Sequence, residues 1–377
     1  MELPDDILEW MAEATGGQVI SSIRIPAGAS REGWFVDVQV EAAQQPLYLR
    51  LDRRGTPQGS AFHSLWVEAQ IFRALHDTGV TVPRIIAIHP TREAFLAERI
   101  SGQTWFYRIR DRGEQVRVAR DFVRNLAALH RLDPSQLDIP GLGPVQPACQ
   151  LVLAELERMR GRATGPDQHI DPLIEVCLDW LTRNVPDYDG PVVLVQGDTG
   201  PGNFLYENGR VTAVVDWELA HWGDPMDDIA WLSLRTVQDT FTHFPDRLRE
   251  YEQLSGHQID PVRVWYYRLL AETRLASSAR GGASATAEMS GEARDPGNRL
   301  IYGMLHRRLT LEALGRVAAI DLPPTPLPQE GEPRPHHHVY DDCLAALGTI
   351  VPRIEDLLAA QWSKGIARAL KYLKEID

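Results

Sequence analysis

The sequence of 377 residues predicts an α+β fold with two lobes, in which a small antiparallel sheet is followed by a larger, mainly helical part. Two observations lead to this prediction. Short segments of alternating apolar and polar residues are concentrated in roughly the first hundred residues. Beyond residue 101 the apolar residues recur mainly every three or four positions, as in amphipathic helices. A chain of this length can bury more than one hydrophobic core, which allows two lobes and an additional segment.

The first lobe is expected over residues 1–100, where a helix precedes three strands, a second helix and two further strands. Three short strands in succession indicate an antiparallel sheet, because connections this short cannot hold a crossover. In chain order, the expected elements cover residues 5–15, 18–25, 34–40, 47–51, about 62–78, 84–88 and 94–98.

The second lobe is expected over residues 101–321 and is mainly helical. One strand signal interrupts it, and the richest polar segment of the chain follows directly after this strand. The expected helices lie around residues 118–129, 150–160 and 171–183, and the strand covers residues 191–195.

A Pro-rich linker is expected at residues 322–338, which contain six prolines. Residues 339–377 then form a helical extension, which either docks on the second lobe or provides a self-association surface in a homodimer. Three consecutive histidines, starting at His336, end the linker. No carboxylate-rich framework surrounds them, so a solvated polar tract is preferred over a metal site.

The composition excludes several classes of function. The chain has 39 Lys and Arg against 52 Asp and Glu, a net charge of -13, which argues against a broad nucleic-acid surface. No apolar run approaches the roughly 20 residues of a membrane helix, and the amino terminus is acidic, so membrane insertion and secretion are disfavoured. The three cysteines are widely spaced and lack metal-ligand spacing, which favours reduced thiols in a cytoplasmic protein.

The polar segment contains a predicted hairpin. Asn208 and Gly209 lie between two short apolar runs, the strongest local signal for a two-residue turn. Counting from this turn places Asn203 opposite Val214, with Asp216 two residues further on the same face. Diagonal neighbours lie about 7 Å apart, so an amide oxygen and a carboxylate could hold one Mg²⁺ between them. The expected pairs are Glu207–Arg210, Leu205–Thr212 and Asn203–Val214.

Asp198 precedes Asn203 by five residues, in a loop that is rich in glycine. This spacing matches the protein-kinase catalytic loop, where the aspartate accepts the proton of the substrate hydroxyl and the asparagine holds a metal. A Gly-rich turn with a helix-capping aspartate is the alternative for an isolated match. Agreement with the hairpin and with Asp216 favours the catalytic interpretation.

These motifs resemble the aminoglycoside phosphotransferase-like, or choline-kinase-like, superfamily, which has a two-lobed protein-kinase-like fold. The resemblance is closest to the subgroup of kinase-like domains found alongside acyl-CoA dehydrogenases. It implies that Asp198 is the catalytic base, that Asn203 and Asp216 bind Mg²⁺, and that Asp228 is a structural acid supporting the catalytic loop. The segments that carry the resemblance are residues 196–203, 216–218 and 223–230.

The resemblance also places a nucleotide site in the first lobe. Ser30 belongs to the loop that covers the phosphates, Arg50 takes the place of the phosphate-binding lysine, and Glu68 is its ion-pair partner. Glu98 and Ile100 lie in the connection whose backbone binds adenine, so ATP is expected and GTP is the alternative. Without the downstream loop, Arg50 and Glu68 would be interpreted as surface charges.

Two residues depart from the family pattern. Gln196 stands where histidine is usual, and Arg50 replaces a compact ammonium with a planar guanidinium. The implied activity is in-line, Mg²⁺-assisted transfer of the γ-phosphoryl group of ATP to a hydroxyl of a small molecule. An aminoglycoside-type antibiotic kinase and a catalytically silent nucleotide-binding protein are the alternatives. Candidate acceptor-binding segments are residues 150–183 and 238–300.

Overall fold

In the computed structural model, the described residues form two compact units. Of the described residues, those within 2–24, 31–158 and 182–268 belong to the first unit, and residue 25 with those within 159–181 and 269–376 belongs to the second. The two units are considered separately below. The structure describes residues 2–25, 31–53, 55, 62–163, 170–284, 296–324 and 336–376.

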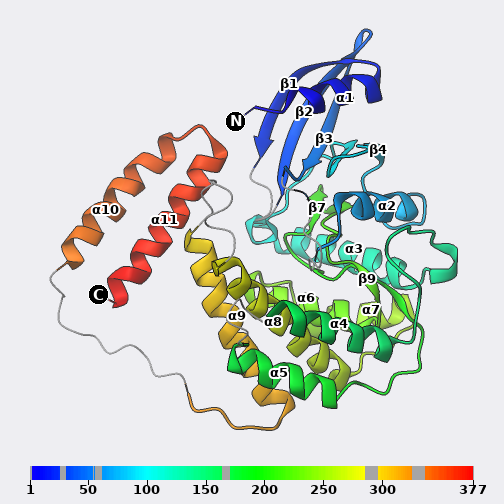
Figure 1. The fold of residues 1–377 in the computed structure, drawn as a ribbon, viewed down its shortest axis with the longest axis vertical. Helices are drawn as coiled ribbons and strands as arrows, with labels where there is room; N and C mark the ends of the chain where they lie inside the picture. The colour runs from blue at the N-terminus through cyan, green and yellow to red at the C-terminus, as the bar shows by residue number, and fades with distance from the viewer. Residues whose placement is uncertain are drawn as a thin grey trace. The chain divides into compact units, whose positions relative to one another are not determined.

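The first unit begins with a five-stranded sheet in the order β1-β2-β3-β5-β4 (Figure 1). Strands β2 and β3 pair in antiparallel register, and so do β3 with β5 and β4 with β5. Helix α1 (Asp5–Thr15) buries Ile7 and Met11 in the core of this sheet. The strands are β1 (Gln18–Ile25), β2 (Glu32–Val40), β3 (Ala43–Leu51), β4 (Ile85–Ile88) and β5 (Ala94–Glu98).

Alternation along β2 and β3 produces this core. Trp34, Val36 and Val38 of β2 are buried, as are Leu47 and Leu49 of β3. Successive strand residues face opposite sides of a sheet, so every second residue reaches the core. Helix α2 (Leu65–Leu75) follows, and the expected antiparallel sheet with one inserted helix is confirmed.

The rest of the first unit is mainly helical. Two short two-stranded sheets lie beside the helices, pairing β6 with β9 and β7 with β8. Helix α3 packs against α7 and against strands β6 and β8. Its bounds and those of the other elements are α3 (Arg112–His130), β6 (Val193–Val195), β7 (Phe204–Glu207), β8 (Arg210–Val214), β9 (His221–Gly223), α6 (Met226–Gln238) and α7 (Phe244–Ser255), with short 3₁₀ turns at Phe106–Arg108 and Pro134–Gln136.

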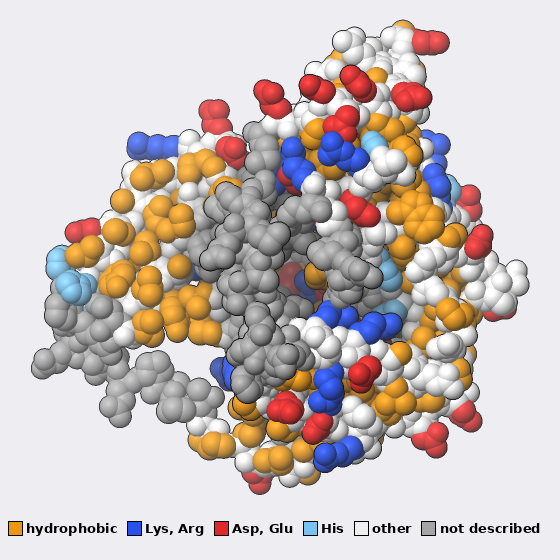
Figure 2. All heavy atoms as spheres, in the orientation of Figure 1, with side chains coloured by type: hydrophobic (Ala, Val, Ile, Leu, Met, Phe, Trp, Pro, Cys, Tyr) orange, Lys and Arg blue, Asp and Glu red, His pale blue; other side chains and the backbone are white. Residues whose placement is uncertain are grey.

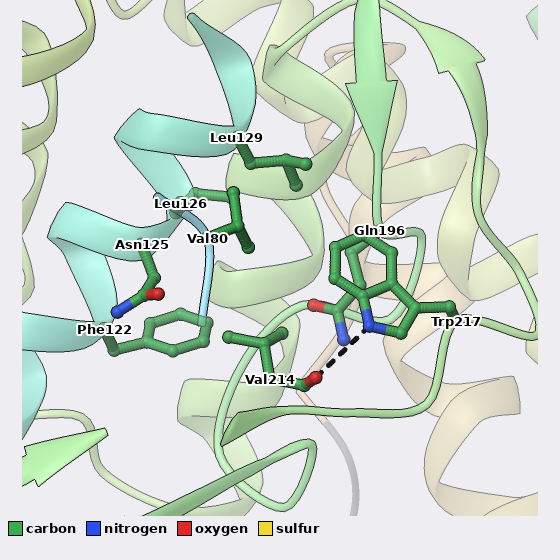
Figure 3. A pocket seen from close by; sticks show the side chains of 8 residues that line it. All are labelled: Val80, Phe122, Asn125, Leu126, Leu129, Gln196, Val214 and Trp217. Carbon is green, nitrogen blue, oxygen red and sulfur yellow. Dashed lines mark hydrogen bonds between the residues drawn. The ribbon is translucent and has the colours of Figure 1, made fainter. Parts of the chain in front are cut away.

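Figure 3 shows the interior between α3 and the segments that carry Gln196 and Trp217. The indole N–H of Trp217 donates to the Val214 carbonyl at 3.2 Å. The cavity between these side chains measures about 10 Å³, close to the smallest volume that holds one water molecule, so it is a packing gap and not a substrate site. Phe122 and Leu126 of α3 close it from the opposite side.

The second unit is helical. Helices α9 and α11 pack together, as do α10 and α11. Helix α10 begins at His337, two residues before the predicted start of the extension. The helices are α9 (Pro296–Val317), α10 (His337–Ile350) and α11 (Leu357–Ile376), with a 3₁₀ turn at Val351–Arg353, while α4 (Ala148–Ala163), α5 (Pro172–Arg183) and α8 (Pro261–Ser284) have residues in both units.

Several apolar side chains of α10 and α11 are exposed, and Figure 2 shows hydrophobic side chains gathered over these two helices. Self-association through the extension stays a prediction. Within the described ranges, no helix combines the length and apolar character needed to cross a membrane.

Candidate active site

The loop after β6 is held by the buried carboxylate of Asp228, in the first turn of α6. Asp228 accepts hydrogen bonds from the backbone N–H of Gln196 at 2.9 Å and of Gly197 at 3.0 Å. The hydroxyl of Thr199 also donates to it, and Nε2 of His130 lies 3.0 Å away. Burial by itself would raise the pKa of Asp228, but these hydrogen bonds and the charge of His130 hold the pKa below its ordinary value. The supporting position expected for Asp228 is confirmed.

Asp198 lies in this loop with both carboxylate oxygens engaged. Nε of Arg235 donates to Oδ1 at 2.9 Å, and a terminal nitrogen of the same guanidinium donates to Oδ2. The Asn203 amide nitrogen donates to Oδ2 and to the Asp198 carbonyl, both at 2.7 Å. Burial raises the pKa of Asp198, and the charge of Arg235 opposes this rise. The amide nitrogen of Asn203 thus faces Asp198.

The hairpin turn at Asn208–Gly209 and the pair Glu207–Arg210 are as predicted. The two further pairs are wrong, because a β-bulge shifts the register between Leu205 and Tyr206. Leu205 therefore pairs with Ala213, instead of with Thr212.

Beyond the bulge, Asn203 is hydrogen-bonded to Val215, and the predicted partner Val214 pairs with Phe204. The N–H of Val215 donates to the Asn203 carbonyl at 2.9 Å, and the Gln196 amide donates to the Val215 carbonyl at 2.8 Å. Asp216 follows directly, with a φ of 64°. Asn203 and Asp216 are thus brought together, although by a different register from the one predicted.

A cluster of five charged side chains adjoins this loop, and we call it the charge cluster. Arg50 contacts Glu68 at 3.1 Å, Asp216 at 3.0 Å and Glu218 at 3.1 Å. Arg31 contacts Glu68 at 3.1 Å and Glu218 at 3.2 Å. Burial and the charge of Asp216 raise the pKa of Glu218 to about 8. The cluster thus combines three carboxyl groups with two guanidinium groups.

The remaining predicted site residues have different outcomes. The expected ion pair between Arg50 and Glu68 is present, with Glu68 fully buried. Ser30 lies outside the described residues. Glu98 lies at the end of β5, where its N–H donates to the Arg84 carbonyl at 3.0 Å, so this donor is already used within the first unit. Ile100 follows it and is half-buried.

Three charged residues near the site were not singled out from the sequence: Arg31, Glu218 and Arg235. Glu218 had a signal, since it belongs to the segment 216–218 that carries the family resemblance. Arg235 had none, because an arginine in an amphipathic helix is ordinarily interpreted as part of a solvated face.

The side chains of Asn203 and Asp216 are of a kind that could bind one Mg²⁺ ion between them. The described residues hold no group of three or more His, Cys, Asp or Glu arranged for a metal ion. An amide oxygen of Asn203 and a carboxylate oxygen of Asp216 supply two hard donors, which matches the habit of Mg²⁺ to take one or two protein ligands and complete its shell with phosphates and water. Oδ1 of Asp216 accepts a hydrogen bond from Arg50, so Oδ2 is the oxygen of this carboxylate to consider as a metal donor.

Comparison with known proteins supports the family assignment. Residues 22–265 match the model of the Phosphotransferase enzyme family, and the chain therefore belongs to that family. Human acyl-CoA dehydrogenase family member 11 is 28% identical over 231 residues, which is 55% of this chain. The chain spans only 29% of the length of that protein.

Two solved structures share the kinase-like fold. A thermostable mutant of aminoglycoside phosphotransferase APH(4)-Ia, in a ternary complex with ADP and hygromycin B, gives a TM-score of 0.59 at 17% identity, covering 83% of this chain and 99% of that one. Choline kinase LicA from Streptococcus pneumoniae gives a TM-score of 0.59 at 16% identity, covering 83% and 98%. The predicted superfamily and fold class are confirmed.

Proposed function

We propose that this chain transfers the γ-phosphoryl group of ATP to a hydroxyl of a small molecule, with Mg²⁺ as its metal. The observation that carries the proposal is the joint placement of Asp198, Asn203 and Asp216. Asn203 donates to the Asp198 carboxylate at 2.7 Å, and its backbone accepts from the residue that precedes Asp216 at 2.9 Å. These are the three groups that phosphoryl transfer by positioning and charge stabilisation requires.

In this mechanism, Asp198 orients the acceptor hydroxyl and takes its proton. The hydroxyl oxygen forms a bond to the γ-phosphorus as the bond to the β–γ bridging oxygen breaks, and ADP leaves. Asn203 and Asp216 would hold Mg²⁺, which supplies charge neutralisation on the phosphate oxygens. Arg50, fixed by Glu68 at 3.1 Å, would contact the phosphates, and the adenine would bind near Glu98 and Ile100. GTP is the alternative donor.

The remaining assignments belong to the same proposal. Residues 1–100 bind the nucleotide and residues 101–321 complete the catalytic and acceptor sites, with 322–338 as linker and 339–377 as helical extension. The cysteines Cys149, Cys177 and Cys343 are free, which is compatible with a cytoplasmic enzyme.

The acceptor is proposed to be a neutral or anionic metabolite. A pocket with a net negative charge favours the binding of a cationic aminoglycoside. Here the guanidinium of Arg235 neutralises the carboxylate of Asp198, to which it donates at 2.9 Å. The charge at the proposed base is therefore less suited to a cationic acceptor, which argues against the antibiotic-kinase alternative.

The test measures ATP consumption with Mg²⁺ across a panel of hydroxyl compounds that includes hygromycin B. Candidate acceptors are first selected by thermal shift in the presence of Mg-ATP. Asp198→Ala should lower acceptor-dependent turnover by at least about 100-fold, since a general base contributes about 10²–10⁴-fold. Asp216→Ala should abolish Mg²⁺-dependent turnover, whereas Asp246→Ala, at an exposed acid of α7, should have no effect.

Two results would count against the proposal. Undiminished turnover in Asp198→Ala or in Asp216→Ala would remove the assigned base or the assigned metal ligand. Binding of AMP-PNP by the wild-type chain, without turnover of any acceptor in the panel, would favour the catalytically silent protein.

A further inference from the structure

Helix α6 contacts the catalytic loop at two points on one face. Asp228 and Arg235 are seven residues apart, close to two helical turns, so both side chains leave the helix on the same side. Asp228 holds the loop backbone at Gln196 and Gly197, and Arg235 holds the side chain of Asp198. One helix face thus fixes both the loop and the carboxylate that the loop presents.

The loop is shaped to allow this contact. Gly200 has a φ of 139°, and a Cβ atom there would lie 2.8 Å from Cβ and 3.0 Å from Cγ of Arg235. A side chain on Gly200 would therefore push the loop away from the stem of Arg235. The absence of a Cβ allows the backbone to approach closely enough for the guanidinium to reach Asp198.

The hydrogen bonds make the two oxygens of Asp198 unequal. Oδ2 accepts from Arg235 and, at 2.7 Å, from Asn203. Oδ1 accepts from Nε of Arg235 at 2.9 Å. Each carboxylate oxygen accepts about two hydrogen bonds, so Oδ2 has its full number, whereas Oδ1 can accept one more.

We propose that Arg235 is a positioning residue, whose planar fork holds the Asp198 carboxylate so that Oδ1 receives the proton of the acceptor hydroxyl. This inference rests on the proposed function. A guanidinium that donates to both oxygens fixes the plane of a carboxylate, whereas the single ammonium of a lysine fixes only a distance. The fork thus determines which oxygen faces the acceptor, and Asn203 keeps the other oxygen occupied.

The alternative is that Arg235 and Asp198 form an ion pair that only stabilises the fold. Their side chains are 22% and 19% exposed, so the pair is largely buried, and removing one partner of such a pair destabilises a fold. A purely stabilising pair would affect unfolding but not the chemical step. The two explanations therefore differ in what removal of the guanidinium does to kcat.

The test uses the full chain with the variants Arg235→Ala and Arg235→Lys, and Arg124→Ala as the control, since Arg124 is an exposed arginine of α3. Mg-ATP turnover is measured with glycerol and with water as acceptors, and AMP-PNP affinity by calorimetry. Arg235→Ala should lower kcat about 100-fold, because misplacing a reacting group by about 1 Å costs that much. AMP-PNP affinity should stay within about twofold of the wild type, since Arg235 is outside the proposed nucleotide site.

Two further measurements address the positioning itself. Added guanidinium ions should restore part of the turnover of Arg235→Ala but none of that of Asp198→Ala, and Arg235→Lys should retain more turnover than Arg235→Ala. A crystal structure of Arg235→Ala should show the Asp198 carboxylate rotated from its wild-type orientation. An unchanged carboxylate, turnover within about threefold of the wild type, or AMP-PNP affinity that falls in parallel with kcat would each overturn the inference.

Failure of the proposed function gives a different result. A wild-type chain that neither binds AMP-PNP nor consumes ATP would refute the kinase assignment. The orientation of Asp198 in the Arg235→Ala structure would still decide whether Arg235 positions this carboxylate.

Discussion

Asp228→Ala should be the most destabilising single change near the loop that follows β6. Asp228 is fully buried and serves four groups: the N–H of Gln196, the N–H of Gly197, the hydroxyl of Thr199 and the imidazole of His130. Each buried donor left without a partner costs about 1 kcal/mol or more. The total is about 4 kcal/mol, which corresponds to a decrease in melting temperature of about 10 °C for a domain of this size.

The assay is thermal and urea unfolding of Asp228→Ala and Asp228→Asn, with Asp227→Asn as the matched control. Asp227 is the adjacent acid on α6 and is also buried, but its carboxylate contacts His221 alone, at 3.0 Å, among the ion pairs of the described residues. Asp228→Asn should cost about 2 kcal/mol, because its amide replaces one acceptor oxygen with a donor. Asp227→Asn should cost less. Equal destabilisation by the two Asn variants would refute the reasoning.

The pH dependence of this effect has a definite sign. Hydrogen bonds outweigh burial and lower the pKa of Asp228 in the folded protein. A carboxyl whose folded pKa is depressed stabilises the protein above its unfolded pKa, and that contribution is lost as the pH falls through the folded value. The difference in stability between wild type and Asp228→Asn should therefore stay constant from about pH 5 to 8 and narrow in acid.

Two further predictions concern packing and thiol reactivity. Gly200→Ala should destabilise by roughly 1–3 kcal/mol in urea unfolding, since its Cβ would lie 2.8 Å from Arg235, whereas Gly348→Ala, with nothing within 4 Å, should not destabilise. A loss of stability below this range in Gly200→Ala would contradict the close approach between Gly200 and Arg235. Burial raises the pKa of Cys177 to about 11, so only about 0.1% of this thiol is thiolate at pH 8. Ellman's reagent should therefore modify the exposed Cys343 first and Cys177 only after unfolding. Rapid modification of Cys177 in the folded protein would refute its burial.

Local patterns were sufficient for most of the secondary structure. Alternation predicted β2 and β3 because one face of each strand is buried, and helical spacing predicted α3 because residues such as Phe122 and Leu126 face one core. The Asn208–Gly209 turn was predicted correctly because both residues tolerate the positive φ that the turn requires, 52° and 77°.

The register beyond that turn could not be counted from the sequence. The bulge displaces Thr212 from its expected partner, and the Thr212 hydroxyl donates to the Ser101 carbonyl at 2.8 Å. Ser101 is 111 residues away in the chain, so this contact leaves no trace in the local pattern. Another distant contact is made by Trp222, whose buried indole donates to the carbonyl of Gly143, 79 residues away, at 3.0 Å.

Candidate base and metal ligands were recognisable in the chain because Asp198, Asn203 and Asp216 lie within nineteen consecutive residues of a turn-rich segment. The partners of these groups were not recognisable. Arg235 is 37 residues from Asp198, and Arg50 is 166 residues from Asp216. A lone arginine in a strand or helix has the same local pattern whether it faces water or a buried carboxylate. Folding alone distinguishes the two cases, because the energy of a charge depends on which opposite charge and how much solvent lie within a few ångströms of it.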